Sequence, residues 1–346
     1  MAHSTRNMTN APAATTTLVT LEDLHRAEAR LRGVALRTPL LEVEFPESIR
    51  TADSRRLYLK AESLQPIGSF KLRGAYNKAA SLPEAERARG LISYSSGNHA
   101  QGVAYAARAL GTHAIIVMPS SAPAIKRKAT EALGAEIVTV GPSSQERKAK
   151  AEELAALHGY TIIPPYDDLE IIAGQGTCGL EILAELPDVD LVLAPVGGGG
   201  LLSGVSAAIK RMQPRVQVWG VEPELAGDAA ESLARGSIVS YSAEQTSRTL
   251  ADGLRVQQLG EHTFAHLRAF VDGIVCVSEE EILQAMRATL FAARLLVEPS
   301  GAVAVAAMLY HSHELPPAKK ICTILSGGNV EPETLARVLA AKPVAV

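Results

Sequence analysis

The sequence of 346 residues has few cysteines and no excess of charge of one sign. Its three cysteines, Cys178, Cys276 and Cys322, lie far apart, which argues against a disulfide framework and a structural zinc site and fits a reducing cytoplasm. The formal net charge of −3 provides no basic surface for a nucleic acid, so no nucleic-acid partner is expected. The length leaves room for two domains.

The sequence also lacks a clear membrane span and a signal peptide. The longest uncharged stretch, residues 191–209, contains four consecutive glycines and a proline, which is typical of a strand, a loop and the start of a helix. Residues 1–20 are rich in Thr, Ala and Asn without the apolar core of a signal peptide, so a disordered tail is predicted. No membrane partner is expected.

Short apolar, β-branched runs alternate along the chain with longer helical stretches. Fully apolar strands between helices predict parallel sheets covered on both faces, and therefore an α/β fold. The predicted strands are residues 90–94, 114–118, 136–140, 191–196, 216–221, 274–277 and 321–325, and the clearest predicted helices are residues 100–110, 124–133, 143–158 and 279–296. Residues 232–274 are poorer in strand pattern.

Two motifs combine glycine with polar side chains at the start of a predicted helix. In residues 68–75 (GSFKLRGA), Lys71 beside Phe70 is a candidate for Schiff-base formation with an aldehyde cofactor, although a solvated lysine is the simpler interpretation of this motif alone. In residues 95–102 (SSGNHAQG), hydroxyl and backbone N–H groups gather between a strand and a helix. That arrangement favours an anion site over a single N-cap.

Two further motifs follow predicted strands. Residues 197–200 are four consecutive glycines, a costly run that indicates close approach of the backbone to a ligand such as a phosphate. Residues 326–329 (SGGN) follow the last predicted strand. Ligands of open parallel sheets bind outside the carboxyl ends of the strands. Three of the four motifs are therefore predicted to converge on one crevice.

A different class of function stays open on one further motif. Residues 174–179 (GQGTCG) match the dinucleotide fingerprint G-x-G-x-x-G, which would suit a NAD-dependent oxidoreductase. Acidic residues precede this match and no clean strand leads into it, so the match is weak. A ligand-binding protein without catalytic activity is another alternative.

Taken in order, the motifs S-F-K-x-R-G-A, S-S-G-N-H-A-Q-G, G-G-G-G-L and S-G-G-N resemble those of the fold-type II pyridoxal-phosphate (PLP) enzymes. Within these, the chain is similar to the threonine/serine dehydratase and serine racemase family, from about residue 21 to its C-terminus. The resemblance implies two three-layer αβα domains with open, mostly parallel sheets, similar to the tryptophan synthase β chain. It also implies pyridoxal 5'-phosphate as the cofactor.

The resemblance assigns roles by position. Lys71 would form the Schiff base and act as the catalytic base, and Ser96 would be an acid or base on the opposite face of the substrate. The residues implied in cofactor binding are Phe70, Lys71, Asn98, Gly197, Gly198, Gly199, Gly200, Leu201 and Ser326. Those implied in binding the substrate carboxylate are Ser95, Ser96, Gly97, Asn98 and His99.

The implied activity is that of an ammonia-lyase, which converts a β-hydroxy amino acid such as L-threonine or L-serine to a 2-oxo acid and ammonia. A serine or amino-acid racemase, and a dehydratase for 3-hydroxyaspartate or 3-phenylserine, are the nearest alternatives. The hydroxyl of Ser326 would not hold the pyridine nitrogen protonated as an aspartate would. The cofactor would then withdraw electrons less strongly, which favours elimination over transamination.

A divalent cation is a further candidate. Glu222, Ala226 and Asp228 can supply two carboxylates and a backbone carbonyl, which are the hard oxygen ligands that Mg²⁺ or Ca²⁺ takes. The serine racemase branch has a similar spacing of residues at its metal site. An acidic helix cap is the alternative interpretation.

The motifs also predict how the chain is divided. Residues 90–167 would form a small domain for the substrate carboxylate, inserted in a larger cofactor-binding domain of residues 21–89 and 168–346. The expected partner is a small amino-acid substrate. The resemblance implies a homodimer or homotetramer, and a cytoplasmic location is expected.

Overall fold

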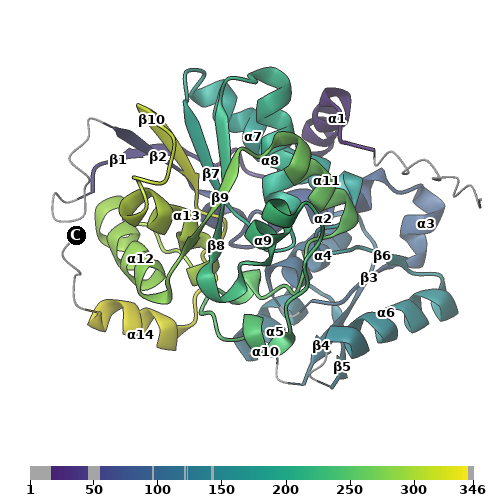
Figure 1. The fold of residues 1–346 in the computed structure, drawn as a ribbon. Coiled ribbons are helices and arrows are strands. Elements are labelled where there is room, and N and C mark those ends of the chain that lie inside the picture. The colour runs from purple at the N-terminus through teal and green to yellow at the C-terminus, as the bar shows by residue number, and fades with distance from the viewer. Residues whose placement is uncertain are drawn as a thin grey trace, which may run out of the picture.

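The fold is seen in a computed structural model, which describes residues 17–45, 55–95, 97–120, 122, 124–141 and 144–341. The described residues form two separate sheets, each with helices packed against it (Figure 1). This arrangement confirms the predicted α/β fold with mostly parallel sheets. Within the described ranges, each helix is too short or too polar to cross a bilayer.

The larger sheet has six strands in the order β1-β2-β10-β7-β8-β9. The pairing of β1 with β2 is antiparallel, and the other pairings are parallel. The strands are β1 (Leu40–Val43), β2 (Arg56–Lys60), β10 (Lys320–Ile324), β7 (Leu191–Pro195), β8 (Gln217–Pro223) and β9 (Gly273–Val277).

Both faces of this sheet are covered, as the apolar strands predict. On β7, Leu191 and Leu193 pack in one core with α12 (Glu279–Ala293) and α13 (Pro299–Tyr310). The alternate residues Val192 and Ala194 pack in another core with α7 (Leu169–Glu185) and α8 (Gly200–Met212). Apolar side chains on both faces explain why β7 reads as a continuous hydrophobic run.

The smaller sheet has four parallel strands in the order β5-β4-β3-β6. Its strands are β3 (Leu91–Ser93), β4 (Ala114–Pro119), β5 (Glu136–Val140) and β6 (Thr161–Ile162). One face packs against the alanine-rich α4 (Asn98–Ala109), and the other packs against α6 (Ser144–His158). All four strands lie within residues 90–167, although the boundaries of a domain there stay a prediction.

The remaining elements surround the two sheets (Figure 1). The weak strand pattern of residues 232–274 corresponds mainly to helices and loops before β9. These elements are α1 (Leu21–Leu31), η2 (Glu62–Leu64), α2 (Lys71–Ser81), α3 (Glu84–Arg89), α5 (Ala124–Ala132), η3 (Glu224–Ala226), α9 (Asp228–Arg235), α10 (Ala243–Thr246), η4 (Asp252–Leu254), α11 (Glu261–Phe270) and α14 (Pro332–Ala340).

Each of the seven predicted strands is present, with its bounds shifted by at most two residues. The predicted helix over residues 279–296 is wrong at its end, because α12 stops at Ala293 and Arg294 adopts a left-handed φ of 58°. The predicted disordered tail at residues 1–20 lies mostly outside the described residues, and α1 begins at Leu21 after a Thr20 cap.

Helices α7 and α8 approach each other closely through glycine. A Cβ added at Gly204 of α8 would lie 2.2 Å from the carbonyl oxygen of Ile172 and 2.5 Å from the backbone nitrogen of Gly176, both on α7. Gly174 and Gly176 are equally crowded. The G-x-G-x-x-G segment therefore lies inside a helix and serves helix packing, not a strand-to-helix turn that could hold a dinucleotide.

Replacing Gly204 with alanine should destabilise the protein. In an uncrowded helix, replacing glycine with alanine adds about 1 kcal/mol to the free energy of unfolding. Overpacking lowers this free energy by about 1–3 kcal/mol. A loss of stability would therefore show that the two helices lie too close for a Cβ atom at this position. The measurement is the free energy of unfolding in urea. Met212→Ala, at an exposed position of α8, is the control and should change it by less than about 0.5 kcal/mol. A more stable Gly204→Ala protein would contradict this packing.

Candidate active site

The loop before α2 pairs with the loop after β10. The backbone nitrogen of Phe70 donates to the carbonyl of Ser326 at 3.0 Å, and Ser69 forms a β-bridge with Gly327. Gly68 has a left-handed φ of 72°, and a Cβ there would lie 2.4 Å from the Asn329 side chain. The first and fourth motifs, about 250 residues apart, are therefore in direct contact.

Lys71 is the first residue of α2 and its side chain is half-buried. Its Nζ donates to the carbonyl of Pro165 at 2.7 Å and lies 5.3 Å from the centre of the Phe70 ring. Burial lowers the pKa of the Lys71 amine to about 8, because the charged form loses hydration. A larger share of this amine is neutral, and so nucleophilic, near neutral pH than for an ordinary lysine.

Asn98, the first residue of α4, joins the second motif to the fourth. Its Nδ2 donates to Glu298 Oε1 at 2.6 Å, and its Oδ1 accepts from Asn329 Nδ2 at 2.8 Å. Burial first, and then the negative charge of Asp252, raises the pKa of the Glu298 carboxyl to about 8. The role of Asn98 toward a cofactor stays a prediction, but its side chain lies at the junction of these loops.

Gly197, Gly198 and Gly199 connect β7 to α8, which begins at Gly200. Gly199 has a left-handed φ of 90°, and a Cβ at Gly198 would lie 2.3 Å from the ring of Tyr166. The N–H groups in the first turn of a helix have no partner within that helix and attract anions. A backbone without side chains at the start of α8 therefore fits a phosphate group. Leu201 is buried in the core behind this loop.

The residues expected to bind a substrate carboxylate are only partly described. Ser96 lies outside the described residues. The Ser95 hydroxyl accepts from the backbone nitrogen of Gly97 at 3.3 Å, in the loop that leads into α4. His99 is buried, and its Nε2 lies 3.0 Å from the carbonyl of Ile163, so the ring anchors α4 to the end of β6. Burial and then the charge of Lys71 lower the pKa of His99 to about 3, which keeps the ring neutral.

Ser326 follows β10 and is almost fully buried. Its hydroxyl donates to the carbonyl of Ser300, at the start of α13, at 3.4 Å. Because a hydroxyl can rotate, the Ser326 O–H could donate to another acceptor nearby instead. Ser326 lies next to the Ser69–Gly327 bridge, and so close in space to the loop that leads into Lys71.

Sequence reasoning did not identify the contacts of residues 165–167. The Pro165 carbonyl accepts from Lys71, and the Tyr166 ring lies against the glycine run. Asp167 accepts from the backbone nitrogens of Glu261, His262 and Thr263, which caps α11. This segment thus lies between Lys71 and the start of α8. Its prolines and acidic residues resemble any surface turn in sequence, which is why no pattern revealed the contacts.

Glu222 and Asp228 are both buried. The Glu222 carboxylate accepts from the backbone nitrogens of Ala229 and Ala230 at 3.1 and 2.8 Å, whereas both carboxylate oxygens of Asp228 are buried without a hydrogen-bond partner. Burial raises the pKa of Asp228 to about 7, and burial with the nearby Asp228 raises the pKa of Glu222. Among the described residues, no group of three or more His, Cys, Asp or Glu side chains could hold a metal.

Comparison with known protein families identifies the family of the chain. The family profile described as "Pyridoxal-phosphate dependent enzyme" matches residues 31–327. The chain belongs to this family. Pyridoxal phosphate is therefore the cofactor, and the glycine run, Lys71 and Ser326 provide groups that fit its phosphate, aldehyde and ring nitrogen.

Similar proteins span nearly the whole chain. An L-threonine ammonia-lyase of Thermotoga maritima is 43% identical over 93% of this chain and 78% of its own. An L-threo-3-hydroxyaspartate ammonia-lyase of Saccharomyces cerevisiae is 39% identical over 93% of this chain and 97% of its own. The structure of maize serine racemase has a TM-score of 0.86 and 34% identity, and covers 94% of this chain and 98% of that chain.

The Lys71 amine should react with an acylating reagent at a lower pH than an ordinary lysine. Its reactivity should rise with pH around a midpoint of about 8, because the neutral amine forms as the proton leaves. The measurement is competitive acetylation of the cofactor-free protein from pH 6 to 11, with mass spectrometry of the Lys71 peptide. A lysine model peptide in the same tube should have a midpoint of about 10.4. A Lys71 midpoint equal to that of the peptide would contradict the desolvated site.

Proposed function

We propose that the protein is a PLP-dependent ammonia-lyase acting on a β-hydroxy amino acid, with L-threonine as the first candidate and L-serine as the next. The single observation that carries this proposal is Lys71, whose amine is desolvated and whose neighbour Phe70 bonds to Ser326 in the loop after β10. The names of the similar proteins support the reaction class. In this reaction the hydroxyl leaves the β-carbon as water, and the unsaturated amine hydrolyses to a 2-oxo acid and ammonium.

When bound, pyridoxal phosphate supplies a conjugated ring that withdraws electrons from the α-carbon of an amino acid. Lys71 would hold the aldehyde through its Nζ, and its free amine would accept the α-proton of the substrate. Its lowered pKa suits both tasks, since the neutral amine is the reactive form. In the cofactor-free protein, the Pro165 carbonyl holds this amine in place.

The other residues orient the two ligands. The N–H groups of Gly197 to Gly200 would hold the phosphate at the start of α8, with Leu201 packed behind them. Phe70 would pack against the ring, Asn98 would donate to its 3-hydroxyl, and the Ser326 hydroxyl would donate to its nitrogen. Because a hydroxyl does not supply a negative charge, Ser326 would leave that nitrogen unprotonated, which favours elimination.

The loop of Ser95, Ser96, Gly97, Asn98 and His99 binds the substrate carboxylate through N–H and hydroxyl groups at the start of α4. The neutral ring of His99 supports this loop from below by its contact with Ile163. Ser96 could also move a proton on the face opposite Lys71, which would make the protein an amino-acid racemase. The resemblance to maize serine racemase keeps this second activity in the proposal.

The proposal includes alternative substrates that differ in their side chains. Its alternatives are 3-hydroxyaspartate, which the yeast relative's name suggests, and 3-phenylserine. We also propose a cytoplasmic homodimer or homotetramer. The reduced cysteines support this location: Cys178, Cys276 and Cys322 are each free.

Mg²⁺ or Ca²⁺ is proposed as a second ligand of the protein, held by Glu222, Asp228 and the backbone carbonyl of Ala226. The two unpartnered oxygens of Asp228 support this, because buried carboxylate oxygens without a partner are rare in a native protein. Water would complete the oxygen ligands that these cations take. The N–H bonds to Glu222 are those of a helix cap and do not exclude a cation.

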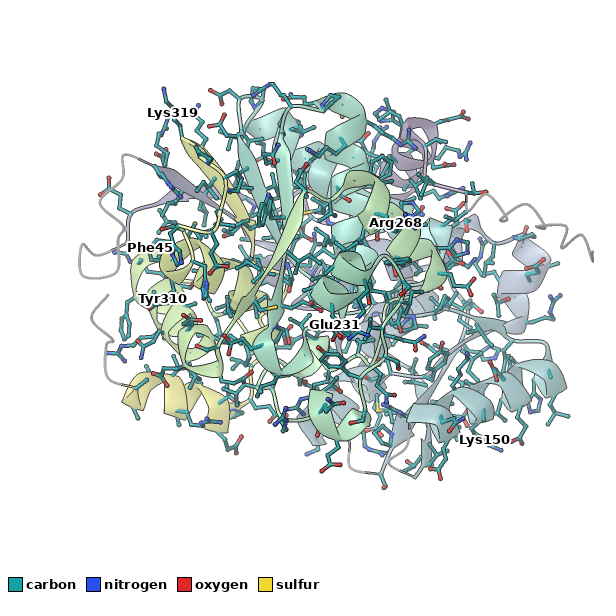
Figure 2. All side chains as sticks on the ribbon, viewed as in Figure 1. Phe45, Lys150, Glu231, Arg268, Tyr310 and Lys319 are labelled. Carbon is teal, nitrogen blue, oxygen red and sulfur yellow. The ribbon has the colours of Figure 1, made fainter. Side chains whose placement is uncertain are left out.

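Lys71→Ala should abolish release of 2-oxobutanoate from L-threonine, because one amine both holds the cofactor and moves the α-proton. Loss of at least about 10³-fold in kcat is expected. The measurement is a coupled assay of 2-oxo acid with stoichiometric ammonia, run in parallel with L-serine, 3-hydroxyaspartate and 3-phenylserine. Lys150→Ala, on the outer helix α6 (Figure 2), is the control and should keep full activity. A wild-type protein without 2-oxo acid release from any of these substrates would refute the ammonia-lyase proposal.

Magnesium should stabilise the protein through Glu222 and Asp228. A ligand at 100 times its Kd adds about 2.7 kcal/mol to the free energy of unfolding, so the Tm should rise with Mg²⁺ or Ca²⁺ and fall with a chelator. Glu222→Gln should remove this response, whereas Glu224→Gln, at a neighbouring exposed carboxyl, should keep it. A Tm that responds to neither cation nor chelator would contradict the cation site and leave Glu222 as a cap of α9.

A further inference from the structure

The largest fully buried side chain of the described chain is that of Arg73, two residues after Lys71. It lies in a cluster of four buried or nearly buried ionic side chains, Lys60, Glu62, Arg73 and Glu181, called here the Arg73 cluster. The Arg73 Nε and Nη2 donate to Glu62 at 2.8 and 2.7 Å. Its Nη1 and Nη2 donate to Glu181 at 2.7 and 2.9 Å.

The guanidinium of Arg73 connects three elements. Glu62 lies in η2, directly after β2, and Glu181 lies in α7, whereas Arg73 itself belongs to the first turn of α2. Arg73 Nη1 also donates to the Thr177 hydroxyl of α7 at 3.1 Å. The start of α2 is therefore tied both to the large sheet and to the helix that packs against α8.

Each carboxylate of the cluster has further partners. Glu62 accepts from the Thr38 hydroxyl at 2.6 Å and from Gln65 Nε2 at 3.2 Å. Glu181 lies 2.8 Å from Lys60 Nζ, and Lys60 also donates to the Thr38 carbonyl at 2.6 Å. Glu185 Oε1 also lies 3.5 Å from Lys60 Nζ, so three carboxylates surround the two cations. The Arg73 guanidinium meets each of Glu62 and Glu181 through two N–H groups. Lysine could match the charge of Arg73 but not this paired geometry.

A buried ionic network of this kind adds little to the stability of the folded protein. The desolvation of buried ions cancels much of their attraction, and well-packed apolar side chains often replace them without loss of stability. What a forked arginine between two fixed carboxylates does provide is a defined position for the backbone that carries it. In this chain that backbone is the helix turn beginning at Lys71.

Lys71 itself has few restraints. Its side chain makes one hydrogen bond, to Pro165, and no charged partner contributes to the shift of its pKa. On the N-terminal side its backbone is held by the contact of Phe70 with Ser326. On the C-terminal side, Gly74 donates to Gln175 and Arg73 makes the ionic contacts described above.

We infer that Arg73 is a positioning residue for Lys71: through Glu62 and Glu181 it fixes the first turn of α2, so that the Lys71 amine stays in its desolvated place within reach of the cofactor aldehyde. This inference rests on the proposed role of Lys71. It assigns a function to the arginine of the S-F-K-x-R-G-A motif, which touches neither the cofactor nor the substrate in the proposed mechanism.

Arg73→Lys is the test, because it keeps the charge and removes the fork. The first readout needs no cofactor: the pH midpoint of Lys71 acetylation should move from about 8 toward the value of an ordinary lysine, about 10.4, as the loosened amine gains water. The second readout is the concentration of pyridoxal phosphate that half-saturates covalent attachment to Lys71, trapped with borohydride and located by peptide mass spectrometry. It should rise about ten-fold.

Lys60→Met is the matched control, since Lys60 belongs to the same cluster but bonds to Glu181 and the Thr38 carbonyl and not to α2. It should change the urea midpoint as much as Arg73→Lys or more, while keeping the Lys71 midpoint near 8 and the trapping concentration within about two-fold. Equal shifts in the two variants, or an unshifted Lys71 midpoint in Arg73→Lys, would overturn the inference.

If Arg73→Lys fails to fold, Glu181→Gln takes its place, because it weakens one fork and leaves the fork to Glu62. The inference is supported if the pH midpoint of Lys71 acetylation is higher in Glu181→Gln than in Lys60→Met. Equal midpoints in the two variants would overturn it. Failure of the proposed function can be told apart from failure of this inference. If Lys71 does not bind the cofactor, borohydride will trap no cofactor on Lys71 of the wild-type protein. The acetylation midpoints of the variants would still show whether Arg73 positions the amine.

Discussion

The site depends on the pairing of two loops that are about 250 residues apart. Ser69 and Phe70 bond to the backbone of Ser326 and Gly327, so the helix that begins with Lys71 starts at the carboxyl end of β10. Strand β10 lies between β2 and β7 in the sheet, and β7 ends in the glycine run. One backbone pairing thus brings the start of α2 to the loop after β10, at the same edge of the sheet as the glycine run.

Helix packing completes this arrangement. Gly176, Gly179 and Gly204 allow α7 and α8 to approach closely, whereas Gly174 lies against α2, and α8 starts at the glycine run. Helix α7 also supplies Glu181 to the Arg73 cluster, so the same helix packs against α8 and contacts the first turn of α2. Helix α7, which has no proposed catalytic residue, therefore helps to set the distance between Lys71 and the glycine run.

Much of this could be predicted from sequence, for identifiable reasons. Strand β7 is apolar on both faces, and four glycines in a row have few uses other than backbone contact with a ligand. Strand β2 (RLYLK) was not predicted because charged residues occupy both its ends, and β6 has only two residues. The partners of Arg73 were invisible because Glu181, 108 positions away, reads as an ordinary helical glutamate until tertiary packing buries it.

A crystal structure of the protein with pyridoxal phosphate tests the central claim most directly. The account predicts continuous density from the Lys71 Nζ to the cofactor, with the phosphate within hydrogen-bond distance of backbone nitrogens of residues 197–200 and the ring nitrogen facing Ser326. Density joined to a different lysine, or a phosphate bound away from the start of α8, would contradict it.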